Sequence, residues 1–493
     1  MSASPGSNTP DRGQQPVLAS QRAKTNQEAI KRGYFPLGYK AAVGQWWASI
    51  SPAMAEHTVL SFIPYLQKPP THTQTGSAPA SAQQSTTSIN SDPARQAAPV
   101  RTNSINDPYG PRSWHSNLVK LSGKNRALNE FSIERVGEEV EENLVMLHGY
   151  GAGLGFFYKN FEGLSRVKGW KLYALDMLGM GRSSRPPFRV HAKDQAGKIA
   201  EAENWFIDAL EEWRVLKKID KFTLLGHSMG GYMAVAYALK YPGHLNKLIL
   251  ASPVGIPEDP YAMQAEMPEP QDSTMANEFL QDQEEDIVQG SGNSGSKSNS
   301  KKPPFELKEA PRRPLPKWLA LHNYAYSLFR QRGSGEYVLA YILAPGAFAR
   351  SPLIRRINGV GRQPLPAPSA TQSPTSTEVT PSTSSTSSSQ KPRLTKETGI
   401  PVVMMYGEND WMDIAGGYAA EQKLKEEKAK ALKNASAEER ANEHGSAKVV
   451  IIQKAGHHLY LEGWEEFNEV MREEMEETKR STRKAIENGS KKL

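Results

Sequence analysis

The sequence of 493 residues contains no cysteine, which excludes a disulfide scaffold, a cysteine nucleophile and cysteine-ligated zinc. It has no continuously apolar run of about 18 residues or more, so no membrane-spanning helix is evident. It also lacks a Walker-A loop, a dinucleotide-binding fingerprint, an HExxH pair and an EF-hand loop, and we therefore expect no metal and no cofactor. The net charge of +7 is too diffuse to indicate a nucleic-acid partner, although it permits attraction to anionic lipid.

Three stretches poor in large apolar residues interrupt the chain, at 68–105, 288–303 and 361–393. They cannot bury enough apolar surface to offset the entropy lost on ordering, so we interpret them as a linker and two surface insertions. The blocks that they separate look like one domain. The predicted organisation is an N-terminal region with linker at 1–106, a core in two parts at 107–258 and 399–475, a cap insertion at 259–398, and a charged tail at 476–493.

The N-terminal region has two features that bear on location. Residues 1–35 are polar and basic, which resembles a mitochondrial transit peptide, and an ordinary disordered tail fits them equally well. Residues 41–66 carry one charge, Glu56, and include Trp46 and Trp47, aromatics of the kind found at lipid–water boundaries. This segment predicts one or two short helices that either lie on a membrane or pack on the protein core.

Apolar runs that are typical of buried strands alternate with segments of helical periodicity. This alternation predicts an α/β fold in which a mainly parallel sheet is covered by helices on both faces. An earlier pair of weaker strands would add an antiparallel edge. The predicted strands are 117–121, 128–135, 143–149, 170–179, 222–228, 245–253, 401–407 and 448–456, and the predicted helices are 196–216, 230–242 and 417–443.

A G-x-S-x-G motif, Gly226-His227-Ser228-Met229-Gly230, lies between a predicted strand and a predicted helix. That context indicates a nucleophile elbow, a turn so tight that its flanking residues must be Gly. The turn would project the Ser228 hydroxyl above the sheet and place the Met229 N–H beside the reacting carbonyl. We therefore predict Ser228 as the nucleophile and Met229 as an oxyanion donor, with His227 as a candidate substrate contact.

The loop after an earlier strand, which begins His148-Gly149-Tyr150-Gly151, should supply the second oxyanion donor. The Tyr150 N–H is the preferred donor, and Gly151 is the next candidate. Glycines let the backbone approach a substrate closely, which makes Gly149 and Gly151 candidate substrate contacts. His148 and Asp176 are predicted to have structural roles, Asp176 by pinning a loop at the sheet edge.

The acid of a triad should follow the predicted strand that ends at Gly407. Glu408, Asp410 and Asp413 are the candidates, and Asp410 is preferred because it stands three residues after the glycine. Its role would be to fix the imidazole tautomer and to stabilise the imidazolium. Asp413 remains the second choice.

The base should follow the last predicted strand, where Gly456 precedes two histidines. We predict His457 as the base and keep His458 as the alternative. The order Ser228, Asp410, His457 matches that of α/β-hydrolases. Each of the three signals is weak alone, but together they are strong because each residue follows its own strand.

These motifs resemble α/β-hydrolases related to the co-activator of adipose triglyceride lipase and to the fungal cardiolipin-specific deacylase. Members act on acylated glycerolipids and phospholipids, and some members are described as acyltransferases with a His-x4-Asp motif, which corresponds to His457 and Glu462 here. The co-activator has Asn at the position of Ser228, so the resemblance favours catalysis. It covers 107–258 and 310–470 and includes LHGYGAGLGFFYKNF, LDMLGMGRSSRP, ENWFIDALEEWR, LLGHSMGGYMAVAYALKYP, ASPVGIPEDP, YGENDWMD and AGHHLYLEGWEEFN.

The resemblance implies an α/β-hydrolase fold with an inserted helical cap, in which Trp318 is a candidate substrate contact. It implies a serine hydrolase that removes an acyl chain from a phospholipid, with cardiolipin as the expected substrate, at the surface of the mitochondrial inner membrane. A lysophospholipid acyltransferase, a non-catalytic scaffold, and a soluble-ester hydrolase or aminopeptidase are the alternatives.

Overall fold

The computed structural model describes residues 50–66, 100–101, 107–267, 316–365 and 396–490. The predicted transit-like segment at 1–35, Trp46 and Trp47 lie outside these ranges. Most of the three low-complexity stretches also lies outside them.

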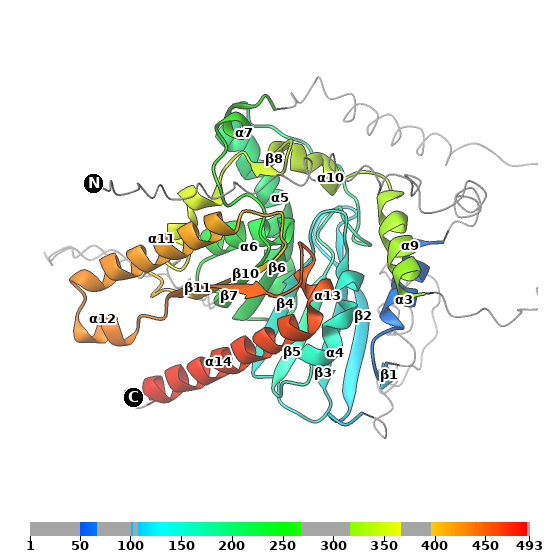
Figure 1. The fold of residues 1–493 in the computed structure, drawn as a ribbon, viewed down its shortest axis with the longest axis horizontal. Coiled ribbons are helices and arrows are strands. Elements are labelled where there is room, and N and C mark those ends of the chain that lie inside the picture. The colour runs from blue at the N-terminus through cyan, green and yellow to red at the C-terminus, as the bar shows by residue number, and fades with distance from the viewer. Residues whose placement is uncertain (1–49, 67–99, 102–106, 268–315, 366–395, 491–493) are drawn as a thin grey trace, which may run out of the picture. The chain divides into compact units, whose positions relative to one another are not determined.

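One sheet forms the centre of the molecule (Figure 1). The strand order is β1-β2-β3-β5-β4-β6-β7-β10-β11, and every neighbouring pair from β5 to β11 is parallel, whereas β1, β2 and β3 make antiparallel pairs. The predicted α/β class with a mainly parallel sheet is therefore confirmed. The strands are β1 Val100–Arg101, β2 Arg112–Lys120, β3 Ala127–Arg135, β4 Glu142–Leu147, β5 Trp170–Leu175, β6 Phe222–His227, β7 Leu245–Ala251, β10 Pro401–Gly407 and β11 Ser446–Ile452.

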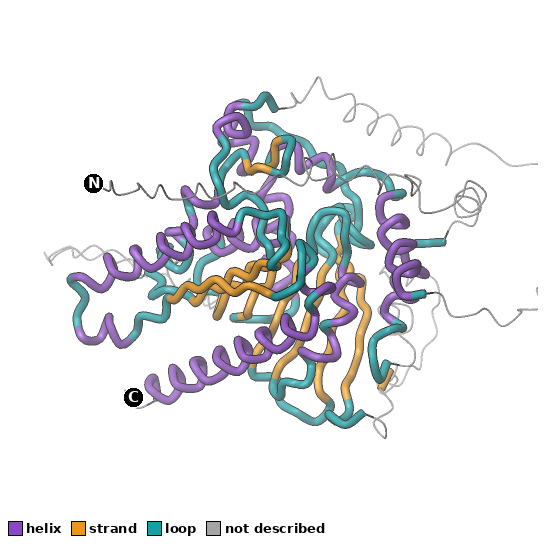
Figure 2. Tube along the Cα trace, viewed as in Figure 1, coloured by secondary structure: helices purple, strands orange, loops and turns teal. Residues whose placement is uncertain are grey.

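Helices cover both faces of the sheet, which Figure 2 shows as one layer of strands between helices. Successive residues of β4 explain the arrangement: Val145 and Leu147 belong to one buried apolar cluster, and Leu144 and Met146 to the other. Because both faces are buried, the central strands have continuous apolar sequences. One face packs against α5 Gln195–Leu216, α6 Met229–Lys240 and α11 Ile414–Lys433, and the other against α3 Pro52–Leu60, α4 Phe161–Leu164, α13 Leu459–Glu462 and α14 Trp464–Ser490.

Two helices differ from the sequence expectation. The helix expected at 417–443 ends at Lys433, and a separate helix, α12 Ala437–Ala441, follows it. The break has a local cause: Ser436 and Glu439 form a capping box, in which each side chain accepts a hydrogen bond from the other residue's backbone N–H. Because the capping box starts a second helix here, α11 and α12 are separate helices.

The C-terminal helix α14 crosses the boundary predicted at 475 without interruption. It is tied to the sheet by Lys247 of β7, a buried side chain whose ammonium lies 2.6 Å from a carboxylate oxygen of Glu474 and 2.8 Å from one of Glu477. Lys479 binds the Lys168 carbonyl from the next turn. In the described ranges, no helix has both the length and the apolar character needed to cross a bilayer.

The described part of the cap lies between β7 and β10 in the chain. It contains the helices α7 Pro260–Gln264, α9 Lys317–Phe329 and α10 Gly335–Val338, and a small two-stranded sheet of β8 Leu343–Ala344 with β9 Phe348–Ala349. It also contains 3-10 turns of three residues each. Helix α9 lies against α3 (Figure 1). Its Tyr324 is fully buried, whereas Trp318 and Phe329 on its other face are exposed.

Residues 52–66 pack on the protein core, which is one of the two alternatives that the sequence left open for 41–66. Ser51 caps α3, and Ala55, Val59 and Leu60 are buried. Glu56, the only charge of the segment, is also buried. It forms an ion pair with Arg182 and accepts hydrogen bonds from the Asn129 amide (3.1 Å) and the Tyr324 hydroxyl (3.3 Å).

The Glu56 carboxyl has an unusual pKa for a glutamate. Burial raises it most, the Arg182 guanidinium lowers it and the nearby Asp176 carboxylate raises it again, which leaves the pKa at about 7. The group links α3, the cap helix α9 and the loop that contains Arg182.

We expect Glu56→Gln to weaken the pH dependence of stability. Between pH 4.5, the ordinary pKa, and about 7, folded Glu56 keeps a proton that the unfolded chain has released. The free energy of unfolding therefore falls as the pH rises through this window. Urea unfolding at about pH 5 and about pH 8 measures the decrease in the free energy of unfolding between the two pH values. This decrease should be larger in wild type than in the variant, by up to about 3 kcal/mol. Equal losses in the two proteins would contradict this role of Glu56.

Candidate active site

Ser228 lies in the turn between β6 and α6, in a strained conformation with φ 53° and ψ −115°. The two glycines of the motif make the turn possible. A Cβ atom on Gly226 would lie 2.2 Å from the Gly230 carbonyl oxygen, and one on Gly230 would lie 2.7 Å from the His148 carbonyl oxygen. No other residue fits at either position, and the backbone therefore has the geometry of a nucleophile elbow.

The structure brings Ser228, His457 and Asp410 together at the carboxyl ends of three strands. His457 Nε2 lies 3.1 Å from Ser228 Oγ, and His457 Nδ1 lies 3.3 Å from Asp410 Oδ1. The Asp410 side chain is fully buried, and that of His457 is 13% exposed. Because His457 Nε2 can accept the Ser228 proton while Nδ1 faces a carboxylate, the arrangement can generate a serine nucleophile.

Asp410 occupies the position of the acid, and the other two carboxylates have local roles. Asp413 caps α11 by accepting from the Ala415 N–H, and Glu408 accepts from the Lys454 N–H. Burial acts to raise the pKa of Asp410, but hydrogen bonds from His457, from a serine hydroxyl and from the Met412 N–H outweigh it, so the pKa lies below its ordinary value. Asp410 is therefore charged at neutral pH.

His458 lies beside the triad but faces away from Ser228. Its ring packs against Phe156 and against the ring of Tyr460, with Nδ1 3.4 Å from the Tyr460 hydroxyl. Burial, and then the neighbouring His457, lower its pKa. Of the two histidines that the sequence offered, His457 contacts the nucleophile.

Ser252 is a fourth member of the cluster that sequence reasoning missed. It follows β7, is fully buried, and has a left-handed backbone with φ 47°. Its Oγ lies 2.6 Å from His457 Nδ1, and its hydroxyl also hydrogen-bonds to Asp410. When Ser228 donates to Nε2, the proton on Nδ1 is shared between Ser252 and Asp410. The only available signal was its place at the end of the strand predicted at 245–253.

The loop after β4 packs directly on the elbow. A Cβ atom on Gly149 would lie 2.8 Å from the His227 ring and 3.0 Å from Ser228 Cβ, so only Gly allows this approach. Tyr150 follows, and Gly151 has a left-handed φ of 69°. Met229 is the first residue of α6, where a backbone N–H has no acceptor within the helix. The Tyr150 and Met229 N–H groups thus belong to the two backbone segments that flank Ser228.

The predicted substrate contact of His227 needs correction. Its side chain is buried beneath the elbow, and its Nε2 donates to the His457 carbonyl oxygen at 3.0 Å. Burial and the adjacent His457 and His458 rings hold its pKa well below the ordinary value, so it is neutral. Through this hydrogen bond His227 supports the backbone of His457. Its buried side chain does not reach an open surface.

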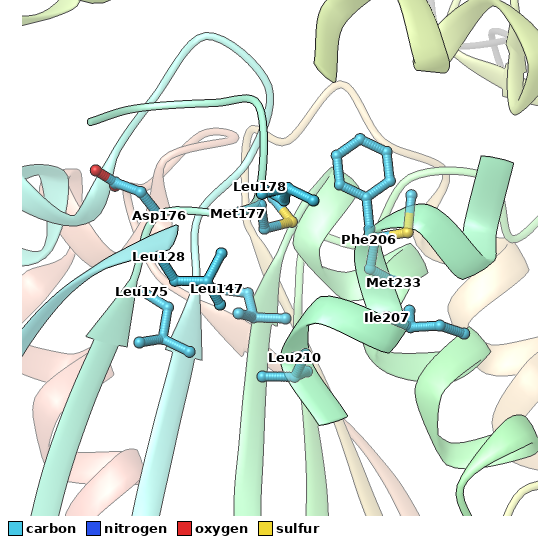
Figure 3. A pocket seen from close by; sticks show the side chains of 10 residues that line it. All are labelled: Leu128, Leu147, Leu175, Asp176, Met177, Leu178, Phe206, Ile207, Leu210 and Met233. Atoms are coloured by element: carbon cyan, nitrogen blue, oxygen red, sulfur yellow. The ribbon is translucent and has the colours of Figure 1, made fainter. Parts of the chain in front are cut away.

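His148 and Asp176 hold the oxyanion loop from behind. Neutral His148 donates from Nδ1 to the Gly149 carbonyl and accepts from the Met177 N–H at Nε2. Asp176 accepts from the N–H groups of Leu154 and Arg182, each at 2.7 Å. Figure 3 shows the Asp176 carboxylate pointing away from the apolar side chains next to it. These contacts agree with the structural roles expected for both residues.

The apolar side chains of Figure 3 enclose a cavity of about 10 Å³, which has room for no more than one water molecule. It lies between the sheet and helices α5 and α6, and it is far too small for an acyl chain. A lipid chain therefore cannot occupy this cavity, in contrast to the outer side of the elbow, where side chains are exposed.

Aromatic side chains surround the elbow on that outer side. Tyr150 is 53%, Phe329 56% and Trp411 58% exposed. The Trp411 ring lies 4.7 Å from the His457 ring, and Tyr150 meets Phe329 edge to face with the ring centres 6.0 Å apart. Trp318, the predicted substrate contact in the cap, does not belong to this rim: it lines a separate groove that includes no triad residue.

A mainly parallel sheet in this order, with a nucleophile turn after β6, an acid after β10 and a base after β11, defines the α/β-hydrolase class. A sequence profile described as alpha/beta hydrolase fold matches residues 142–463, well over half of the chain. The chain belongs to the alpha/beta hydrolase fold family. The family predicted from the motifs is thus confirmed.

Similar curated proteins have lipid-related names. A 1-acylglycerol-3-phosphate O-acyltransferase of Arabidopsis thaliana is 30% identical over 321 residues, which are 62% of this chain and 63% of that protein. The 1-acylglycerol-3-phosphate O-acyltransferase ABHD5 of Mus musculus is 41% identical over 160 residues, 32% of this chain and 42% of that one. A (lyso)-N-acylphosphatidylethanolamine lipase of Bos taurus is 26% identical over 332 residues, 67% and 78% of the two chains. This chain spans less than two thirds of the length of the two acyltransferases.

Among solved structures, a thermophilic esterase from Thermogutta terrifontis is 15% identical, with a TM-score of 0.42 over 74% of this chain and 99% of that one. The carboxylesterase CesB from Bacillus subtilis is 14% identical, with a TM-score of 0.38 over 72% and 90%. These scores carry no information on what this chain acts on.

We expect His457→Ala, but not His458→Phe, to abolish labelling of Ser228 by a fluorophosphonate probe. Without the base, the serine hydroxyl stays protonated and loses several orders of magnitude in reactivity, whereas an aromatic ring at 458 preserves the packing against Phe156. Gel-based labelling rates, with Ser228→Ala as the blank, measure the difference. Equal loss in both histidine variants would refute the assignment.

Ser252→Ala should slow the same labelling by roughly ten- to a hundredfold, since a hydrogen bond to a charged partner contributes roughly 1.5–3 kcal/mol. Loss of the hydroxyl leaves the His457 Nδ1 proton with Asp410 alone, at the longer distance of 3.3 Å. The pH profile of labelling should also change, because the Ser252 hydroxyl contacts both His457 and Asp410. An unchanged rate and profile would show that Ser252 only fills space.

Proposed function

We propose that the protein is a serine carboxylic-ester hydrolase that removes a fatty acyl chain from a glycerophospholipid. The observation that carries the proposal is the hydrogen-bonded set Ser228, His457 and Asp410 on a strained elbow. The strained backbone of Ser228 costs of the order of 1–3 kcal/mol of stability, and strain of this kind is typical of active sites.

In this reaction Ser228 Oγ attacks the acyl carbonyl carbon while His457 Nε2 takes the hydroxyl proton. The Tyr150 and Met229 N–H groups donate to the oxyanion. His457 returns the proton to the leaving alkoxide, and the lysolipid departs. Water, deprotonated by His457, then attacks the acyl-serine, and His457 returns that proton to Ser228 Oγ as the fatty acid is released. Asp410, whose pKa is lowered, stabilises the imidazolium in both steps.

The choice of a phospholipid has two supports. The elbow is ringed by Tyr150, Phe329 and Trp411, exposed aromatics that are favourable in contact with lipid chains and the membrane interface. The curated relatives are named for 1-acylglycerol-3-phosphate and for (lyso)-N-acylphosphatidylethanolamine, which are both glycerophospholipids. Cardiolipin as the substrate, and the mitochondrial inner membrane as the location, belong to the proposal on family resemblance alone.

An acyltransferase is the second candidate, because several relatives carry that name. The two reactions share the acyl-serine and differ in whether water or a lysolipid hydroxyl attacks it. The position that corresponds to the acid of the His-x4-Asp motif is Glu462, whose carboxylate accepts from the Gly456 N–H at 2.8 Å. This contact holds the backbone directly before His457 and would serve either acceptor equally.

The deciding experiment is lipid profiling of purified protein with mixed phospholipid vesicles, wild type beside Ser228→Ala. We expect the wild type alone to release fatty acid and to convert cardiolipin to its lysolipid, because the alanine variant has no nucleophile. Parallel reactions with acyl-CoA and lysophosphatidic acid test the transferase. Acyl transfer that exceeds hydrolysis would favour the second candidate, and lipid turnover independent of Ser228 would exclude both.

A further inference from the structure

A groove with a cavity volume of about 740 Å³ opens where α3, α9 and the loop-helix segment after β4 meet. It is lined by Phe62 and Tyr65 beyond α3, by Lys317 and Trp318 at the start of α9, and by Trp464 at the start of α14. No triad residue lines it. The groove is therefore a concave site separate from the triad.

The groove combines aromatic walls with an excess of positive charge. Lys159 lines it and binds the Leu461 carbonyl with its ammonium, and Lys317 lies 5.9 Å from the Phe62 ring centre. In the described part of the chain neither lysine forms an ion pair with a carboxylate. Glu465 acts on Lys159 only at longer range, and the two ammonium groups repel each other. Two lysines are thus left facing one cavity.

The one carboxylate that lines the groove is already neutralised. Glu162 accepts hydrogen bonds from the Arg166 guanidinium at 2.7 and 3.0 Å and from Arg112 at 3.3 Å. Since Glu162 is paired with two arginines, its carboxylate does not neutralise Lys159 or Lys317. The groove lacks only the anion that would balance its charge.

Trp318 connects the groove to the outer face of α9. It is 64% exposed, and Leu321, Ala325 and Phe329 follow it on the same face at helical spacing. The helix has 13 residues and is about 20 Å long. Phe329, at its far end, contacts Tyr150 beside the elbow. A row of apolar side chains thus runs from the groove to the rim of the active site, exposed at Trp318 and Phe329 and partly buried against the core at Leu321 and Ala325.

We propose that the groove binds the phosphate headgroup of an anionic phospholipid within a bilayer, and that it docks the protein on such a membrane. Lys159 and Lys317 hold the phosphate, and Trp318 enters the interface. A bilayer seated there lies along α9, whose far end contacts Tyr150 beside the elbow, and presents lipid to Ser228. The proposal rests on the proposed function only in the choice of a phospholipid as ligand.

The test measures co-sedimentation of the full chain with vesicles of phosphatidylcholine, with and without about 30% phosphatidylglycerol. We expect Lys159→Gln with Lys317→Gln to lower partitioning onto the anionic vesicles about tenfold, since each lysine contributes at such a surface. The matched control is Lys124→Gln with Lys193→Gln, which removes the same charge from two exposed sites and should lower partitioning less than twofold. Trp318→Ala should weaken binding, whereas Tyr261→Ala should not, although Tyr261 is an even more exposed aromatic elsewhere on the surface.

Two checks keep the result interpretable. Fluorophosphonate labelling of Ser228 in the lysine, Trp318 and Tyr261 variants shows that their fold and triad are intact. Ser228→Ala should bind vesicles like wild type, so that a failure of lipid hydrolysis with normal binding would count against the proposed function and not against the groove.

Three results would overturn the groove as a docking site. Equal losses in the two lysine pairs would mean non-specific attraction. Unchanged binding in the groove variants would mean that another part of the chain covers the groove or that the membrane docks elsewhere. Displacement of the protein from vesicles by millimolar inorganic phosphate at constant ionic strength would identify a free phosphate as the ligand.

Discussion

The structure depends on one constraint, the close approach of the backbone around Ser228. The Gly226 and Gly230 backbones touch, and Gly149 of the neighbouring loop packs against Ser228 itself. These contacts bring the loops after β4 and β6 to one point at the carboxyl edge of the sheet, where ligand sites of parallel sheets form. The nucleophile, the two N–H groups beside it and the support from His227 all follow from that packing.

A second layer of buried polar groups holds this arrangement in place. His148 and Asp176 fix the oxyanion loop, and Asp176 shares its partner Arg182 with Glu56 of α3. Tyr324 of the cap joins the same network through its hydrogen bonds with Glu56 and the Gly155 N–H. Buried groups of this kind are costly unless each is paired, so displacement of α3 or α9 would disturb the loop beside the nucleophile.

The strands and the triad were predictable because their signals are local. An apolar run that ends in Gly marks a strand, and the residues directly after it are the ones that meet at the sheet edge. Ser252 and Glu56 escaped prediction because their partners, His457 and Arg182, are far away in sequence and only the fold brings them together. Trp318 was placed at the substrate because an apolar helix in a cap has no sequence signal for its orientation.

The distance along the chain between Ser228 and His457, 229 residues, has a consequence for biosynthesis. At about 5–20 residues per second, a ribosome needs roughly 10–50 s to pass from one to the other. During that interval β10 and β11 are missing from the sheet, and the serine has neither base nor acid. The hydrogen-bonded set of Ser228, His457 and Asp410 can therefore form only after the last strand of the sheet has been synthesised.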